Sequence, residues 1–115
     1  MKKAALFAFN GEPMCFVHVL LTALDMHANQ ADVKVVIEGS ATALVNQLAK
    51  EGETFHALYE EVKAKGLIDC ACKACSAKTG ALAGIEAQGI VLCDEMKGHP
   101  SMLRYMNEGY EIITF

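Results

Sequence analysis

The sequence predicts an α/β fold, a three-layer α/β/α sandwich built on a mostly parallel five-stranded sheet. Short apolar runs, typical of strands buried on both faces, alternate with amphipathic segments of helical periodicity. The connections between them are about two to six residues long and rich in glycine, asparagine and proline. Strict alternation with short loops is typical of βαβ units, in which successive strands run parallel.

The first strand and first helix are predicted at residues 4–9 and 13–29. The strand is a continuous apolar run that stops at an Asn-Gly loop. Pro13 suits the first turn of the helix, because its missing N–H has no partner to lose there. Four apolar residues at helical spacing mark the buried face of this helix. They are Val17, Leu20, Leu21 and Leu24.

The second strand is the β-branched run 33–37, and two helices are expected after it. Ser40 can cap the first of these helices, which breaks near Gly52. The second helix stops at Gly66 and has apolar residues at positions i, i+3, i+4 and i+7. These residues are Phe55, Leu58, Tyr59 and Val62.

The second half of the chain repeats the alternation of strand and helix. Glycines and polar loops divide it into apolar strands and short amphipathic helices, and Pro100 suits the start of the last helix. The predicted elements are a strand at 67–72, helices at 73–79 and 81–88, a strand at 90–92, a helix at 100–107 and a strand at 110–115.

Length and composition indicate one globular domain over residues 1–115. Hydrophobic residues make up 53% of the chain and charged residues 21%, and no repeat or linker divides it. This apolar share is high for a small monomer and favours surface buried between subunits of a homo-oligomer. Ten basic residues against fourteen acidic ones give a formal charge of −4, which argues against nucleic-acid binding.

The sequence also predicts a cytoplasmic location without membrane contact. No apolar run approaches the roughly 18 residues of a membrane span. Lys2 and Lys3 precede an apolar run, as in signal peptides, but the run ends at Asn10 without a small-residue cleavage pattern. Five cysteines, an odd number, in a chain without an export signal indicate reduced thiols rather than a disulfide scaffold.

Candidate chemistry gathers where the predicted strands end. In open α/β sheets, ligands bind beyond the carboxyl ends of the strands. The loops there hold Cys15, the cluster Cys70-Ala71-Cys72-Lys73-Ala74-Cys75, Cys93 and His99. No glycine-rich phosphate loop accompanies them, so no nucleotide or other cofactor is expected.

The cysteine cluster is the strongest of these signals. Cys72 and Cys75 form a Cys-x-x-Cys motif across a strand end and a helix start, where unsatisfied N–H groups favour a thiolate. Lys73 and Lys78 add positive charge that would lower a thiol pKa further. A thiolate of this kind can attack sulfur and hold a persulfide. Cys70 is a supporting residue in this interpretation.

Other interpretations of the same residues stay open. Cys70 and Cys93 also fit as small buried core residues. Cys-x-x-Cys is a zinc half-site, but no second pair follows at comparable spacing. A closed zinc site would need Cys70, Cys72 and Cys75 together with His99 or Cys93. A thioredoxin-type motif would follow the first strand of its unit, and the Trp and cis-Pro signals of that fold are missing.

His99 has two interpretations of its own. At the start of the last helix it can act as a general acid or orient a sulfur acceptor. Alternatively, His99 and Ser101 simply cap that helix.

Five short segments are together typical of a known family. They are VVIEG at 35–39, GLI at 66–68, CKAC at 72–75, GHPSM at 98–102 and GYEIITF at 109–115. With these segments the chain resembles the DsrE/DsrF-like family, and within it the small YchN-type cytoplasmic proteins associated with sulfur relay. The resemblance covers essentially the whole chain.

The resemblance implies a three-layer domain that assembles as a homo-oligomer, often a trimer or hexamer. In better understood members, a cysteine after the third strand carries a persulfide and passes its sulfur to a partner. That role corresponds to Cys72 or Cys75, whereas well-studied members have one principal cysteine where this chain has three.

The sequence therefore predicts a sulfur carrier that takes sulfur from a donor protein or small thiol and passes it to an acceptor thiol. Its activity would be that of a sulfurtransferase, with Cys72, Cys75 and His99 as catalytic residues and Cys70, Lys73 and Lys78 in support. Whether it is an enzyme is left open. The alternative is a non-catalytic oligomeric module that uses the same cysteines to bind zinc or sense redox state.

Overall fold

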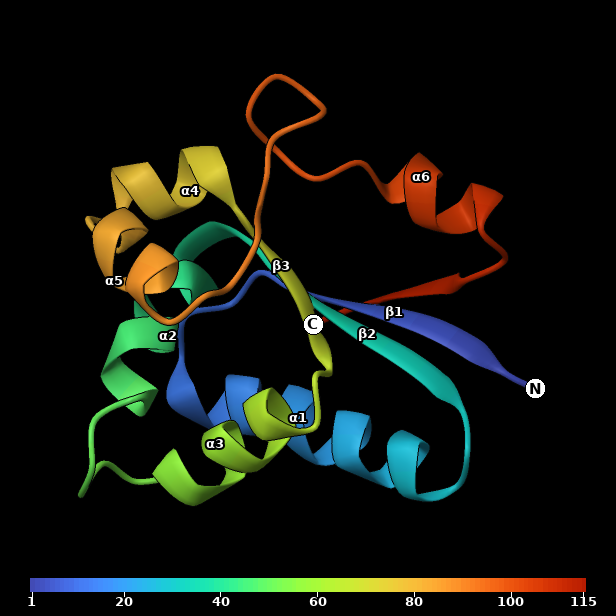
Figure 1. The fold of residues 1–115 in the computed structure, drawn as a ribbon, viewed down its shortest axis with the longest axis horizontal. Coiled ribbons are helices and arrows are strands. Elements are labelled where there is room, and N and C mark those ends of the chain that lie inside the picture. Colours follow the sequence, from blue (N-terminus) through green and yellow to red (C-terminus); the bar gives the residue numbers. More distant parts are fainter.

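The computed structural model describes residues 1–115 and has an α/β fold, with a five-stranded sheet flanked by helices (Figure 1). Every neighbouring pair of strands is parallel, so the prediction of a mostly parallel five-stranded sheet is confirmed. The order of strands across the sheet is β4-β3-β2-β1-β5. The strands are β1 (Lys3–Ala8), β2 (Asp32–Ile37), β3 (Ile68–Cys72), β4 (Leu92–Cys93) and β5 (Glu111–Thr114).

Six α-helices and one 3-10 turn connect the strands. Pro13 is the first residue of the first helix, as predicted, and the Glu12 carboxylate caps this helix by accepting from the Cys15 N–H. The helices are α1 (Pro13–Ala28), α2 (Thr42–Leu48), α3 (His56–Ala64), α4 (Lys73–Lys78), α5 (Leu82–Ala87) and α6 (Met102–Asn107), with the 3-10 turn η1 at Gly39–Ala41.

Two details of the first half differ from the predictions. Ser40 does not cap a helix: its hydroxyl donates to the Phe9 carbonyl and accepts from the Gly11 N–H, joining two neighbouring loops. The helix instead begins at Thr42, after the 3-10 turn. Leu21, expected on the buried face of α1, is 46% exposed, because the buried face is centred on residues such as Phe16 and Leu20.

Two details of the second half also differ. The fourth strand is only Leu92–Cys93 rather than 90–92, because Ile90 packs into the core before strand pairing begins. Pro100 precedes α6 instead of opening it, since the Ser101 hydroxyl accepts from the Arg104 N–H and caps the helix. No helix of the structure is long and apolar enough to cross a membrane.

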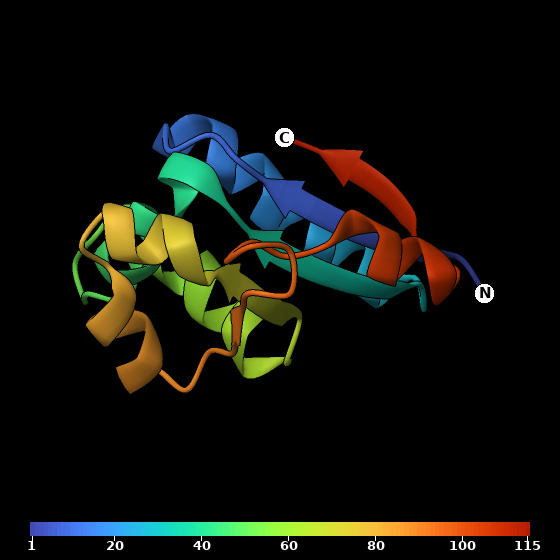
Figure 2. The same cartoon turned by 90° about the horizontal axis from the view of Figure 1, so that it is seen from above.

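The two faces of the sheet are covered unequally. On one face, α1, α2, α3 and α5 pack against strand side chains in a core of 21 buried residues. On the other face, α6 covers a core of only seven, which includes Tyr105 and Tyr110. Figure 1 shows α1 and α3 below the sheet and α6 above it, and Figure 2 shows α4 and α5 beyond the carboxyl end of β1. The loops at the carboxyl ends of the strands remain free to form a functional site.

Candidate functional site

The two free thiols of the cluster lie where β3 passes into α4. Cys72 is the last residue of β3, and its sulfur caps α4 by accepting from the Cys75 N–H at 3.3 Å. The Ser76 hydroxyl, fully buried, donates to the Cys72 carbonyl at 2.6 Å. Because both bonds need the sulfur and carbonyl of Cys72 to face the first turn of α4, the Cys-x-x-Cys spacing brings both thiols to one end of the sheet.

His99 reaches these thiols from the loop after β4. Its Nδ1 lies 3.1 Å from the Cys72 sulfur and 3.7 Å from the Cys75 sulfur. The Gly98 carbonyl accepts from the Ala74 N–H at 2.9 Å, which fixes the loop against α4. Gly98 has a φ of +93°, and a Cβ there would lie 3.1 Å from the Ala74 Cβ, so glycine allows this close approach.

Glu38 joins Cys72, Cys75 and His99 in a four-residue cluster, and the sequence did not identify it as a site residue. It follows β2 directly and is only 6% exposed. Donor atoms of Glu38, Cys72, Cys75 and His99 all lie within 4.8 Å of one another. Burial raises the pKa of the Glu38 carboxyl to about 7. The available signal was an acidic residue directly after the apolar end of a β-branched strand, where a carboxyl is easily taken for part of a solvated turn.

The electrostatics of Cys72 differ from the prediction. Its pKa is raised to about 12, chiefly because the thiol is buried. The neighbouring Cys75 thiol and Glu38 carboxyl contribute to this rise, and the Cys75 N–H opposes it. The expectation of a lowered thiol pKa is therefore wrong for Cys72, because burial outweighs the lowering effect of the N–H at the helix start. A buried thiol next to a buried carboxyl is held in its neutral form.

Cys75 is the thiol that reaches the surface. It is partly exposed and lines a pocket of about 320 Å³, whereas Cys72 is fully buried. The other residues of this pocket are Gly39, Ser40, Lys78 and Thr79. Lys78 thus lines the same pocket as the Cys75 thiol. Lys73 instead pairs with Asp94 at 3.7 Å and lines a different pocket.

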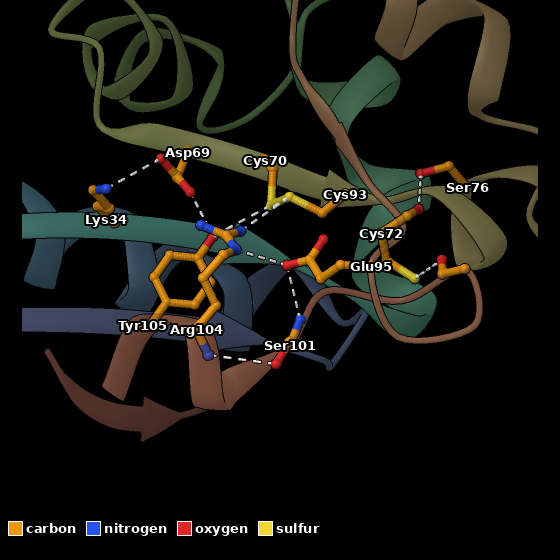
Figure 3. Close-up of a disulfide and its surroundings, with 11 residues drawn as sticks. Lys34, Asp69, Cys70, Cys72, Ser76, Cys93, Glu95, Ser101, Arg104 and Tyr105 are labelled. Atoms are coloured by element: carbon orange, nitrogen blue, oxygen red, sulfur yellow. Dashed lines mark hydrogen bonds and ion pairs between the residues drawn. A yellow bond between two sulfur atoms is a disulfide. The ribbon is translucent and has the colours of Figure 1, made fainter. Parts of the chain in front are cut away.

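Cys70 and Cys93 are joined by a disulfide between β3 and β4. The expectation that all five cysteines are reduced is therefore wrong for this pair, and so is a role for Cys70 as a supporting thiol. Figure 3 shows the disulfide beside Tyr105 and Arg104, with the Cys72 side chain pointing away from it. The Tyr105 hydroxyl also donates to the Asp69 carboxylate, and the Cys70 sulfur lies 3.4 Å from that hydroxyl.

The disulfide also removes two of the ligands considered for zinc. Neither Cys70 nor Cys93 is free to bind a metal ion, and Glu38 stands in their place beside Cys72, Cys75 and His99. Cys15 is a free, exposed thiol at the start of α1 and is not part of this cluster.

Glu95 fixes the part of the loop that follows His99. Its carboxylate accepts from the Ser101 N–H at 3.1 Å and from the Arg104 Nε at 2.8 Å. Burial alone would raise the pKa of Glu95, but these two hydrogen bonds outweigh burial and lower it. Of the two interpretations of this segment, helix capping holds for Ser101, while His99 faces the thiols.

Comparisons with known proteins show the family to which the chain belongs. Residues 3–115 match the family described as the DsrE/DsrF-like family. An uncharacterized protein of Methanocaldococcus jannaschii, MJ0733, is 28% identical over 97 residues, which cover 84% of this chain and 77% of that protein. An uncharacterized protein of Archaeoglobus fulgidus is 37% identical over 43 residues, or 37% of this chain and 70% of that protein.

Proposed function

The chain belongs to the DsrE/DsrF-like family, generally sulfur-relay proteins, and from this premise we propose that it carries sulfur as a persulfide on Cys75. The observation that supports this most directly is the convergence of two free thiols on one imidazole, with only one thiol open to a pocket. An incoming donor meets Cys75 first, because Cys72 is fully buried.

Loading is a nucleophilic displacement at sulfur. The Cys75 thiolate attacks the terminal sulfur of a donor persulfide, the S–S bond of the donor breaks, and its electron pair leaves with the donor thiolate. The Cys75 proton passes to His99, whose Nδ1 lies 3.7 Å from the Cys75 sulfur. The Lys78 ammonium lines the same pocket and favours the anionic persulfide that results.

Release follows one of two routes, and only the second oxidises the protein, because its two thiols then supply the two electrons that reduce the departing sulfur. An acceptor thiolate attacks the terminal sulfur, takes it, and leaves Cys75 as a thiolate. Alternatively, Cys72 attacks the inner sulfur of Cys75, a Cys72–Cys75 disulfide forms, and hydrosulfide departs. The raised pKa of Cys72 favours the first route, since a neutral thiol is a poor nucleophile.

The proposed partners are a sulfur donor, a sulfur acceptor and further copies of this chain. The helix α6 covers the thinner face of the sheet and exposes Leu103 and Met106, which are 62% and 57% accessible. Apolar side chains of this kind support burial against another subunit. Light scattering on the purified protein distinguishes a trimer or hexamer from a monomer.

Intact-mass measurement after exposure to a low-molecular-weight persulfide tests the carrier role. The wild-type protein gains one sulfur atom that a reductant removes, and Cys75→Ser gains none. Cys15→Ser is the matched control, because Cys15 is also a free thiol and is more exposed. Loading that survives in Cys75→Ser and disappears in Cys15→Ser would overturn the assignment.

A further inference from the structure

Four side chains of the site offer a donor set that suits a metal ion. Glu38 after β2, Cys72 and Cys75 at the start of α4, and His99 after β4 supply one oxygen, two sulfurs and one nitrogen. All four donor atoms lie within 4.8 Å of one another, although they come from three separate segments of the chain. Three of the four are groups that zinc prefers in proteins, and the fourth is an accepted ligand.

The spacing of the donors fits a tetrahedral centre. Zinc lies about 2.0–2.3 Å from nitrogen, oxygen and sulfur ligands, so neighbouring ligands of a tetrahedron are about 3.3–3.8 Å apart. The His99 Nδ1 is 3.1 Å from the Cys72 sulfur and 3.7 Å from the Cys75 sulfur. The second distance already lies in that range, and the first is about 0.2 Å short of it, so a small adjustment suffices.

We propose that Glu38, Cys72, Cys75 and His99 together bind one Zn²⁺ ion. This goes beyond the carrier function, because the ion would occupy both thiols and exclude sulfur from them. The zinc-bound and sulfur-loaded forms are therefore alternative states of one site.

Charge at the site supports this proposal. None of the six ion pairs of the chain includes Glu38, so this buried carboxyl has no cationic partner. A divalent cation supplies the missing positive charge. The Cys75 N–H donates to the Cys72 sulfur, which stabilises that sulfur as a thiolate ligand.

Titration of the full-length, chelator-washed protein with Co²⁺ under anaerobic conditions tests the site directly. Cobalt reports tetrahedral thiolate ligation by its visible and thiolate charge-transfer absorption, and Zn²⁺ added afterwards displaces it. We expect one Co²⁺ per chain. We expect Glu38→Gln and His99→Ala to weaken binding at least about tenfold, in the range typical of disturbed metal sites.

Cys15→Ser and His18→Ala are matched controls, since both residues are exposed members of α1 outside the cluster. Wild-type affinity in these controls supports the assignment. Absence of thiolate–cobalt absorption, or unchanged affinity in either Glu38→Gln or His99→Ala, would overturn the four-ligand site. Thermal unfolding of each variant shows that it is folded, and Glu38→Gln preserves the size of the side chain.

The two proposals fail independently. Persulfide loading is measured in the presence of a chelator, and metal binding is measured without any sulfur donor. Loading without cobalt binding disproves the metal site alone, whereas cobalt binding without loading disproves the carrier alone.

Discussion

Reduction of the Cys70–Cys93 disulfide should lower the stability of this fold by a predictable amount. The bridge joins residues 23 apart in sequence and ties β4 to β3. In the chain-entropy treatment, a closed loop of about 24 residues gives about 3.4 kcal/mol of stabilisation at 25 °C. A domain of this length unfolds with about 240 cal/mol/K of entropy near its midpoint, so that loss corresponds to about 14 °C in Tm.

Reduction should also loosen β4 in the folded protein, because little else holds this strand in place. β4 is two residues long and lies at the edge of the sheet, with β3 as its only neighbour. The loop that carries His99 begins directly after Cys93. Loss of the bridge therefore also frees the segment that brings the imidazole to the thiols.

The assay is urea unfolding at one protein concentration, with and without a thiol reductant. Cys70→Ala/Cys93→Ala is the control, because it lacks the bridge under both conditions and should unfold at the same midpoint in each. A change below about 1 kcal/mol in the wild-type protein, or an equal reductant effect in the double variant, would refute the reasoning.

Two further predictions concern the loops that frame the site. Gly11→Ala should cost about 1–3 kcal/mol, because a Cβ there would lie 2.7 Å from the Ser40 carbonyl oxygen, and urea unfolding measures the loss. Glu95→Gln should cost only about 0.5–1 kcal/mol at pH 7, since the pair with Arg104 is over one-third exposed. The folded-state pKa of Glu95 is lowered, so its contribution is present above the unfolded value of about 4.3 and is lost as pH falls through the folded pKa. The difference in stability between wild type and variant should therefore shrink in acid, and a constant difference would contradict this account.

The alternation of apolar runs with amphipathic segments predicts most of the fold. Strands of a parallel sheet are buried on both faces, so they must be apolar, and the helices that cover them must be amphipathic. Strands β1, β2, β3 and β5 lie close to their predicted ranges. β4 was misplaced because a two-residue strand is defined by its partner rather than by its own composition. Ser40 was misassigned for a similar reason, since its hydroxyl finds partners about thirty residues away in sequence that outcompete local capping.

The site shows the same division between local and distant information. The positions of Cys72, Cys75 and His99 follow from strand ends that gather at one edge, which the sequence indicates. Glu38 lies near the two thiols because β2 is the neighbour of β3, and the local sequence pattern does not specify the order of strands. The Cys70–Cys93 bridge depends in the same way on the pairing of β3 with β4.

Because the cluster is assembled from three separate segments, its two thiols gain all of their neighbours only late in synthesis. A nascent chain that has emerged only as far as α4 has Glu38 and both thiols, but it lacks His99, β4 and the partner of Cys70. β5 is formed by the last residues of the chain, so its pairing with β1 is also delayed until they are made. Parallel pairing between distant segments forms slowly. The newly made protein therefore passes through a period in which its cysteines are open to wrong partners, and the redox state of its surroundings decides which bonds form first.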